Sequence, residues 1–205
     1  MTSSPKSASN SLSGKKALVT GAAGFIGSHL TRNLVNSGCE TIALLRPTSD
    51  LWRIKDIAGQ IKTVHGDISH LDQDKLSAQL SGIDFVIHLG AAGIDQATDI
   101  GSVVETNVMG TLGMLQLARS LNVERFVYCG SAFEYGDGSM ITEDSLPIVP
   151  ISEYAASKSG GYLLANTFHN RYGLPVTTVR PFQVYGPTES PNRLVPNTIA
   201  RSLAG

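Results

Sequence analysis

Short apolar segments alternate with helical stretches along most of this chain, and this alternation constrains the fold more than any other feature. The apolar segments lack a polar face, so we interpret them as strands buried on both sides; they lie at residues 17–20, 41–45, 61–64, 85–89, 125–129 and 175–179. Helical periodicity is found between them at residues 25–37, 50–58, 71–80, 101–121 and 153–172. Strands and helices that alternate at this spacing form βαβ units, so the sequence predicts an α/β fold with a doubly wound parallel sheet.

A glycine-rich turn follows the first predicted strand. Gly21, Gly24 and Gly27 are spaced Gly-x-x-Gly-x-x-Gly at the point where the strand gives way to a helix. Gly21 permits a tight turn, Gly24 lets a pyrophosphate touch the backbone, and Gly27 lets the helix lie close to the sheet. The N-terminus of the helix attracts an anion. The turn therefore predicts a Rossmann-type dinucleotide site, the alternative being an ordinary strand-to-helix turn.

The exact order of these glycines, with Gly-Phe-Ile-Gly at its centre, resembles the extended short-chain dehydrogenase/reductase family. Most members of that family act on nucleotide sugars, as NAD-dependent epimerases and dehydratases do. The resemblance extends from about residue 15 to the C-terminus. It implies an NAD(P)-dependent oxidoreductase with a nucleotide-sugar substrate, in which Phe25 and Ile26 border the cofactor.

Composition argues against several other classes of protein. Hydrophobic residues make up 41% and charged residues 16% of the 205 residues, and the formal net charge is -1. This balance argues against a nucleic-acid partner or a polybasic membrane patch, and no apolar run approaches the ~18 residues of a spanning helix. Cys39 and Cys129 offer neither a disulfide framework nor zinc spacing, and the N-terminus lacks an apolar signal core. We therefore expect a cytoplasmic protein without a metal site.

Three regions are expected along the chain. Residues 1–14 are rich in Ser, Thr, Asn and Pro and are interpreted as a disordered tail. Residues 15–190 are expected to form the dinucleotide-binding Rossmann domain, which also carries the catalytic residues. Residues 191–205 are expected to begin a substrate-binding region. Members of the resembling family continue into a small C-terminal domain that grips the nucleotide. If the 205 residues are the whole molecule, we therefore expect it to bind NADP(H) but to turn over nucleotide sugars poorly.

The end of the second predicted strand bears on the choice of cofactor. An acidic residue there would bond the ribose hydroxyls of NAD, but the sequence has Arg46, followed by Ser49 and Arg53. A guanidinium suits a 2′-phosphate, which a carboxylate would repel. We therefore expect NADP, although NAD stays possible because a single Arg can also stack on adenine.

Further cofactor contacts are implied by the resemblance. After the third strand, Asp67 would accept a hydrogen bond from the adenine amino group and the backbone of Ile68 would pair with the ring; the alternative is that Asp67 caps the next helix. After the fourth strand, the backbone at Leu89 and Ala91 would approach the second ribose and the diphosphate. His88 is expected to be a hydrogen-bonded core residue.

Tyr154 and Lys158 lie four residues apart near the start of a predicted helix, so they share one of its faces. A tyrosine can protonate a sugar carbonyl that gains a hydride, and a nearby ammonium lowers the phenol pKa. Ser131 matches the family's catalytic Ser or Thr, and it would stabilise charge on the reacting oxygen. Lys158 would also bond the nicotinamide ribose. Asn107 matches a supporting Asn of the family; the alternative is a polar residue that faces solvent.

The two residues directly after Ser131 narrow the range of reactions. Dehydratases of the family carry an adjacent Asp-Glu pair there, whereas this chain has Ala132 and Phe133, so 4,6-dehydration is not expected. Glu134, one position later, lies on the other face of a strand-like segment and is not expected to act as a base. Three interpretations stay open: an NADPH-dependent reductase of a 4-keto-6-deoxy sugar nucleotide, which Arg46 favours; a 4-epimerase with tightly bound NAD; and a cofactor-binding protein without turnover.

Two further expectations concern the floor of the site and assembly. Residues 180–187 resemble the family's Arg-x-x-Asn-x-Tyr-Gly-Pro segment, with Gln183 in place of Asn, and Arg180 is expected to pair with a backbone carbonyl.

The helices predicted at 101–121 and 153–172 are apolar around most of their circumference, so each needs packing on two sides. We expect a homodimer built on these helices, the alternative being coverage by the same chain.

Overall fold

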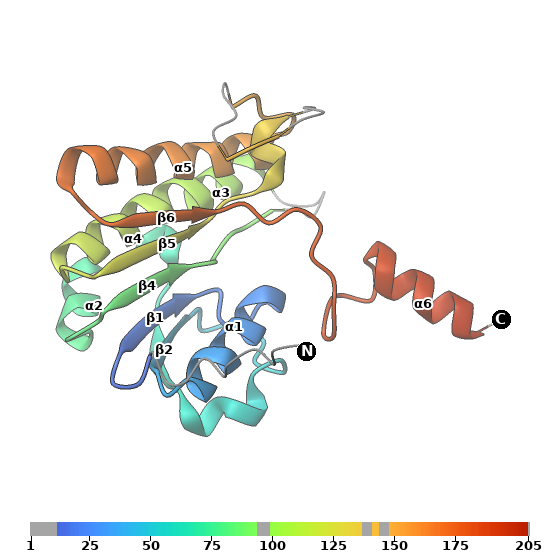
Figure 1. Ribbon diagram of the computed structural model, residues 1–205, viewed down its shortest axis with the longest axis horizontal. Helices are drawn as coiled ribbons and strands as arrows, with labels where there is room; N and C mark the ends of the chain where they lie inside the picture. The colour runs from blue at the N-terminus through green and yellow to red at the C-terminus, as the bar shows by residue number, and fades with distance from the viewer. Residues whose placement is uncertain (1–11, 94–98, 137–140, 144–147, 205) are drawn as a thin grey trace, which may run out of the picture.

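A six-stranded parallel sheet forms the centre of the molecule (Figure 1). The computed structural model describes residues 12–93, 99–136, 141–143 and 148–204. The sheet has the strand order β3-β2-β1-β4-β5-β6, and its strands are β1 Lys16–Thr20, β2 Glu40–Leu45, β3 Lys62–His65, β4 Phe85–His88, β5 Arg125–Cys129 and β6 Val176–Val179. Every neighbouring pair is parallel, which confirms the predicted doubly wound sheet.

Helices cover the two faces of this sheet (Figure 1). One layer contains α2 Gln73–Gln79, α3 Ile100–Val104, α4 Gly110–Ser120 and α5 Glu153–Tyr172, and the opposite layer contains α1 Phe25–Asn36. Successive residues of β1 point into different cores: Leu18 belongs to the core that includes Met114, whereas Val19 belongs to the core that includes Leu34. The strands are apolar on both sides because both sides are covered.

The region predicted as a helix over residues 50–58 folds differently. Residues 52–54 form a turn, and the 3₁₀-helix η1 Lys55–Gln60 follows it. Ile54 and Ile57 are buried while Leu51 and Trp52 are exposed. This three-residue spacing suits one face of a 3₁₀-helix, so the prediction of an α-helix over this region is wrong in helix type and in bounds. The helix predicted over 71–80 is shorter, because Asp72 caps it by accepting a hydrogen bond from Lys75 N at 3.0 Å and Leu80 is extended, so α2 runs from Gln73 to Gln79.

The long helix predicted over 101–121 contains a π-turn. The π-helical segment η3 Glu105–Met109 joins α3 to α4 without a break.

At the C-terminal end of the described residues, α6 Leu194–Ala204 projects away from the sheet and buries none of its residues (Figure 1). Within the residues that the structure describes, none of the helices is long and apolar enough to cross a membrane.

Candidate active site

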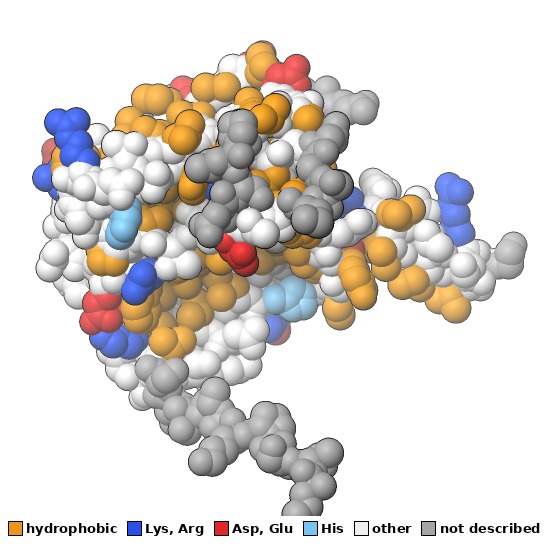
Figure 2. Space-filling model, turned by 45° about the horizontal axis from the view of Figure 1, so that its top comes forward, with side chains coloured by type: hydrophobic (Ala, Val, Ile, Leu, Met, Phe, Trp, Pro, Cys, Tyr) orange, Lys and Arg blue, Asp and Glu red, His pale blue; other side chains and the backbone are white. Residues whose placement is uncertain are grey.

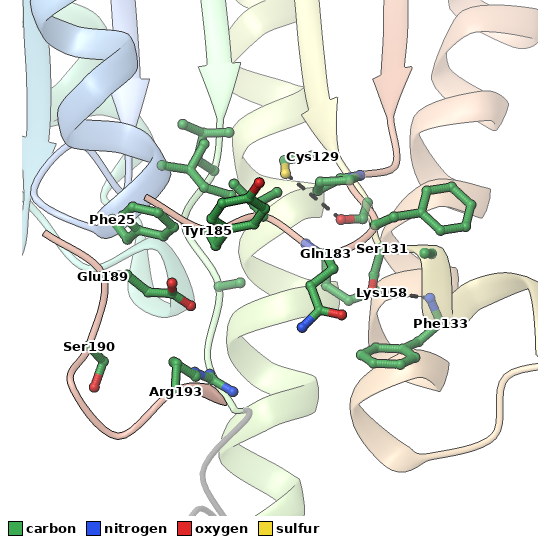
Figure 3. Close-up of a pocket in the computed structure, with 18 of the residues that line it drawn as sticks. Phe25, Cys129, Ser131, Phe133, Lys158, Gln183, Tyr185, Glu189, Ser190 and Arg193 are labelled. Atoms are coloured by element: carbon green, nitrogen blue, oxygen red, sulfur yellow. Dashed lines mark hydrogen bonds between the residues drawn. The ribbon is translucent and has the colours of Figure 1, made fainter. Parts of the chain in front are cut away.

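A cavity of about 760 Å³ opens where the carboxyl ends of β1, β4, β5 and β6 meet (Figure 3). The crossovers from β1 and β4 leave the sheet in opposite directions, and such a switch point is where doubly wound sheets bind ligands. Phe25 and Ile26 line the cavity from the glycine turn, and Leu89 and Ala91 line it from the segment after β4. The structure therefore brings these four predicted cofactor contacts together.

The glycine turn has the backbone form that a dinucleotide needs. Gly21 has a φ of +70°, and a Cβ there would lie 2.8 Å from the carbonyl carbon of Leu89. A Cβ on Gly27 would collide with the carbonyl oxygen of Gly21, so α1 can approach β1 only through a glycine. Gly24 is the N-cap of α1, and the first turn of α1 has no acidic side chain. A Cβ-free cradle at a helix N-terminus fits a diphosphate.

The ends of β2 and β3 hold the other predicted cofactor residues. Arg46 is exposed directly after β2. Asp67 caps η2 by accepting hydrogen bonds from Ser69 N at 3.0 Å and Ser69 Oγ at 2.8 Å, as the capping alternative predicts. Burial acts to raise the pKa of Asp67, but the bonds from Ser69 and the charge of Arg46 hold it below its usual value. Ile68 is buried, and a Cβ on Gly90 would touch its Cδ1 at 3.0 Å.

His88 is a hydrogen-bonded core residue, as predicted. It is fully buried, with Nδ1 at 2.8 Å from Thr20 Oγ1 and Nε2 at 3.1 Å from Thr111 Oγ1. Burial, helped by the charge of Lys158, lowers the pKa of His88 to about 3. The imidazole therefore stays neutral at physiological pH and fastens β1 to β4 and α4.

Ser131, Tyr154 and Lys158 all line the cavity, so the structure brings the predicted catalytic set together; Figure 3 shows Ser131 and Lys158. Ser131 follows β5, while Tyr154 and Lys158 come from the first turns of α5. Lys158 is 2% exposed, and its Nζ lies 4.8 Å from the centre of the Tyr128 ring. This cation–π contact compensates part of the cost of burying the ammonium.

The pKa of Tyr154 moves in the direction opposite to the one expected. Burial raises it to about 12, with further increases from Cys129 and Glu134 and a decrease from Arg193. Burial also lowers the pKa of Lys158. The expectation considered only the attraction between the phenolate and a nearby cation. Burial removes water from the phenolate and destabilises it, and this effect on the pKa is larger than that of the cation. At neutral pH Tyr154 is therefore protonated and can donate its phenolic proton.

Asn107 connects the segment after β4 to α5. Its Oδ1 accepts from Ala92 N at 2.8 Å, and its Nδ2 donates to Ala92 O and to Ser157 Oγ, each at 2.9 Å. Asn107 is 1% exposed, so the solvent-facing alternative is wrong. Because Ser157 precedes Lys158, these bonds tie the cofactor side of the cavity to the catalytic helix.

Sequence reasoning missed an ion pair behind the site. Glu134 is fully buried, and Arg180 Nε donates to its Oε2 at 2.6 Å. The expected bond from Arg180 to a backbone carbonyl is thus replaced by a bond to a carboxylate. Glu189 and Arg193 also line the cavity (Figure 3). Glu189 lies between the Tyr-Gly-Pro sequence and α6, and Arg193 directly precedes α6, so only the nearby Tyr-Gly-Pro sequence could have drawn attention to them.

Proteins of known sequence resemble most of this chain. A UDP-glucuronate 4-epimerase of Thermodesulfobacterium geofontis is 34% identical over 186 residues, which cover 85% of this chain and 58% of that protein. A dTDP-glucose 4,6-dehydratase of Streptomyces niveus is 33% identical over 196 residues, covering 88% of this chain and 57% of its own length. The chain thus spans somewhat more than half the length of these relatives.

Solved structures share the fold. The dTDP-glucose 4,6-dehydratase DesIV from Streptomyces venezuelae, with NAD and TYD bound, superposes with a TM-score of 0.80 at 34% identity and covers 92% of this chain and 62% of that one. A UDP-glucuronic acid 4-epimerase from Bacillus cereus in complex with NAD gives 0.78 at 31% identity, covering 92% and 64%. The profile of the NAD dependent epimerase/dehydratase family matches residues 17–205. The resemblance noted in the sequence is confirmed: this chain belongs to the NAD-dependent epimerase/dehydratase family.

Proposed function

We propose that this chain forms the cofactor-binding and catalytic part of an NAD(P)-dependent oxidoreductase that acts on a nucleotide sugar. One observation carries the proposal: Ser131, Tyr154 and Lys158 line the same cavity as Phe25 and Ile26 of the glycine turn. A nicotinamide cofactor, when bound, supplies the hydride chemistry. The chain itself then has to hold the sugar and move one proton.

Each catalytic side chain has a distinct task in this proposal. Tyr154 donates its phenolic proton to a carbonyl oxygen of the sugar, or accepts a proton when a hydroxyl is oxidised. The Ser131 hydroxyl donates a hydrogen bond to the same oxygen and stabilises charge that develops there. Lys158 keeps a cation next to the phenol, which stabilises the phenolate while it exists.

Two observations favour different forms of this chemistry. Arg46 favours NADP, and with it the reduction of a 4-keto-6-deoxy sugar nucleotide; the protonated state of Tyr154 suits that direction too. The epimerases among the relatives and structural neighbours favour a 4-epimerase that retains NAD. Dehydration is disfavoured because Ala132 and Phe133, which line the cavity, cannot move a proton. We propose the reductase first and the epimerase as the second candidate.

An assay of cofactor use tests the proposal and separates its two forms. The purified chain is mixed with NADPH and a panel of UDP- and dTDP-linked sugars and 4-keto sugars, and both cofactor and sugar are analysed. A reductase consumes one NADPH for each hydroxyl formed. An epimerase interconverts C4 epimers without net cofactor consumption and releases its cofactor on denaturation. Binding of NADPH without any change in the sugars would contradict both forms and favour a protein without turnover.

Arg46→Asp is expected to shift the cofactor preference from NADPH towards NADH by roughly 10- to 100-fold in the ratio of dissociation constants. The reason is that a charge-assisted bond to a 2′-phosphate contributes about 1.5–3 kcal/mol, and a carboxylate would repel that group. Titration of protein fluorescence with each cofactor measures the ratio. Arg201→Asp, on exposed α6, is the matched control and should leave it unchanged. An unchanged ratio for Arg46→Asp contradicts the NADP proposal.

We also propose that the α3–α5 layer forms a homodimer. Ile100, Val104 and Met109 on α3 and η3 are exposed, as is Leu163 on α5, and hydrophobic side chains gather over this layer (Figure 2). Burying these residues in a partner would stabilise the assembly. Light scattering is expected to give twice the 21.7 kDa mass of one chain, and Leu163→Glu should give the monomer. A monomer at micromolar concentration without the substitution contradicts the proposal.

We further propose that residues 191–205 begin the substrate-binding region. Arg193, Leu194 and Val195 line the cavity, whereas the rest of α6 points away from the sheet (Figure 1). A cation at this position could hold the diphosphate of a nucleotide sugar.

A further inference from the structure

The carboxylate of Glu134 is bonded to the backbone of Ser131. Glu134 Oε1 accepts a hydrogen bond from Ser131 N at 2.7 Å, and Ser131 Oγ accepts one from Phe133 N at 3.3 Å. Ser131 and Glu134 form a capping box at the start of the 3₁₀-helix η4 Ala132–Tyr135, in which each side chain bonds the backbone of the other residue. The bond to Phe133 uses a lone pair of Ser131 Oγ, so the hydroxyl proton can still be donated to a ligand in the cavity.

The other oxygen of this carboxylate is held by Arg180, which follows β6. Arg180 Nε donates to Glu134 Oε2 at 2.6 Å, and Arg180 Nη1 donates to Tyr135 Oη at 3.0 Å. The guanidinium carbon also lies 4.0 Å from the centre of the Tyr162 ring on α5. Arg180 thus joins η4 to the end of β6 and to the catalytic helix, which leaves the carboxylate little freedom to move.

The neighbouring backbone leaves room for this carboxylate. A Cβ on Gly130, the residue before Ser131, would collide with Glu134 Oε1 and lie 3.2 Å from Arg180 Cγ. Glu134 itself is 0% exposed and does not line the cavity, unlike Ala132 and Phe133 of the same turn. Both of its oxygens already have partners. These facts argue against a role as a general base and for a role exerted through Ser131.

We propose that Glu134 is a positioning residue, which, clamped by Arg180, fixes the backbone of Ser131 so that the Ser131 hydroxyl faces the reacting oxygen of the substrate. This inference rests on the proposed function, because it assigns Ser131 the task given to it there. The inference extends the active site beyond Ser131, Tyr154 and Lys158 to the buried ion pair of Glu134 and Arg180.

A double-mutant cycle between Glu134 and Ser131 tests the proposal. In Glu134→Gln, an amide NH₂ replaces one of the two carboxylate oxygens, so either Ser131 N or Arg180 Nε faces a donor and loses its acceptor. We expect kcat to fall roughly 10- to 100-fold, less than the ~10²–10³-fold cost of removing such a donor completely. The KM of the nucleotide sugar and the Kd of NADPH should stay within about threefold, since neither depends on where this hydroxyl points in the transition state.

The same substitution in a Ser131→Ala background separates positioning from general damage. Because the hydroxyl is already absent, Glu134→Gln should lower kcat by less than about threefold more. An equal fold-loss in both backgrounds overturns the proposal, and so does an unchanged kcat when Ser131 is intact. Glu124→Gln is the matched control, since Glu124 is exposed and lies before β5, at the opposite end of that strand. It should change neither kcat nor KM.

A readout without turnover keeps the inference separate from the proposed function. Glu134→Leu/Arg180→Met removes both charges together, which proteins tolerate far better than the loss of one partner. The Ser131 amide then has no acceptor, and NMR should show its hydrogen exchange rising at least ~tenfold relative to the Phe126 amide within β5. Unchanged exchange at Ser131 overturns the proposal. If the wild-type chain transforms no nucleotide sugar, the proposed function fails while this measurement still decides whether Glu134 holds Ser131.

Discussion

Tyr154→Phe is expected to lower kcat by ~10²–10⁴-fold while the affinity for NADPH stays unchanged. The substitution removes only the phenolic hydroxyl, and general acid–base groups contribute rate factors of this size. Tyr154 lines the cavity beside Ser131 and Lys158, and burial holds its pKa at about 12, so its proton is available throughout the neutral range. Steady-state turnover and a fluorescence titration with NADPH measure the two quantities.

Tyr172→Phe is the matched control for this substitution. Tyr172 is on the same helix, at its C-terminal end, where its ring packs against Phe168 and Arg119. Loss of its hydroxyl should leave kcat within about twofold, because the ring contacts stay. A loss of less than about tenfold for Tyr154→Phe would show that another group supplies the proton, and the assignment of Tyr154 would then be wrong.

Gly27→Ala should both destabilise the fold and weaken cofactor binding. The new methyl group would collide with the carbonyl oxygen of Gly21, so α1 must move away from β1, and overpacking of this kind costs about 1–3 kcal/mol or more. The shift also withdraws the N-terminus of α1 from the diphosphate. Losing two charge-assisted bonds there would raise the Kd of NADPH by at least ~10²-fold. Thermal unfolding and cofactor titration measure the two effects.

Gly59→Ala provides the control for a methyl group added without collision. Gly59 lies in η1, is exposed, and has nothing within 4 Å of the position that a Cβ would take. We expect the melting temperature of the Gly59→Ala protein to equal or slightly exceed that of the unsubstituted protein, because alanine reduces the conformational freedom of the unfolded chain. Wild-type affinity for NADPH in Gly27→Ala would mean that the turn tolerates a wider gap between α1 and β1 than the structure implies.

The sheet and its glycine turn could be predicted because both depend on local pattern and a few topological rules. Unbroken apolar runs indicate buried strands, and right-handed crossovers leave few arrangements. The Tyr154–Lys158 pair was found because a spacing of four places two side chains on one helix face, and because its position after the glycine turn and after Ser131 matches the resembling family. These features need no knowledge of which distant residues meet in the fold.

The features that sequence reasoning missed depend on distant partners or on burial. Glu134 and Arg180 are 46 residues apart, and neither residue alone indicates that the other neutralises its charge. The raised pKa of Tyr154 comes from enclosure by several segments, which no spacing in the sequence reports. Likewise, Ile54 and Ile57 are three residues apart, a spacing that an α-helix and a 3₁₀-helix both allow.

The π-turn that carries Asn107 amounts to one residue more than a regular helix needs. Deleting Val108 would let α3 run into α4 with uninterrupted i→i+4 bonds, a more regular helix in its own right. The residues inside the turn would then be re-aimed, whereas α3 and α4 would keep their faces, because the π-turn already absorbs the extra residue. Asn107 could no longer reach both Ala92 and Ser157 while α4 kept its place on the sheet. An engineer who sought stability by regularising this helix would therefore gain backbone order and lose the link between the cofactor cradle and the catalytic helix.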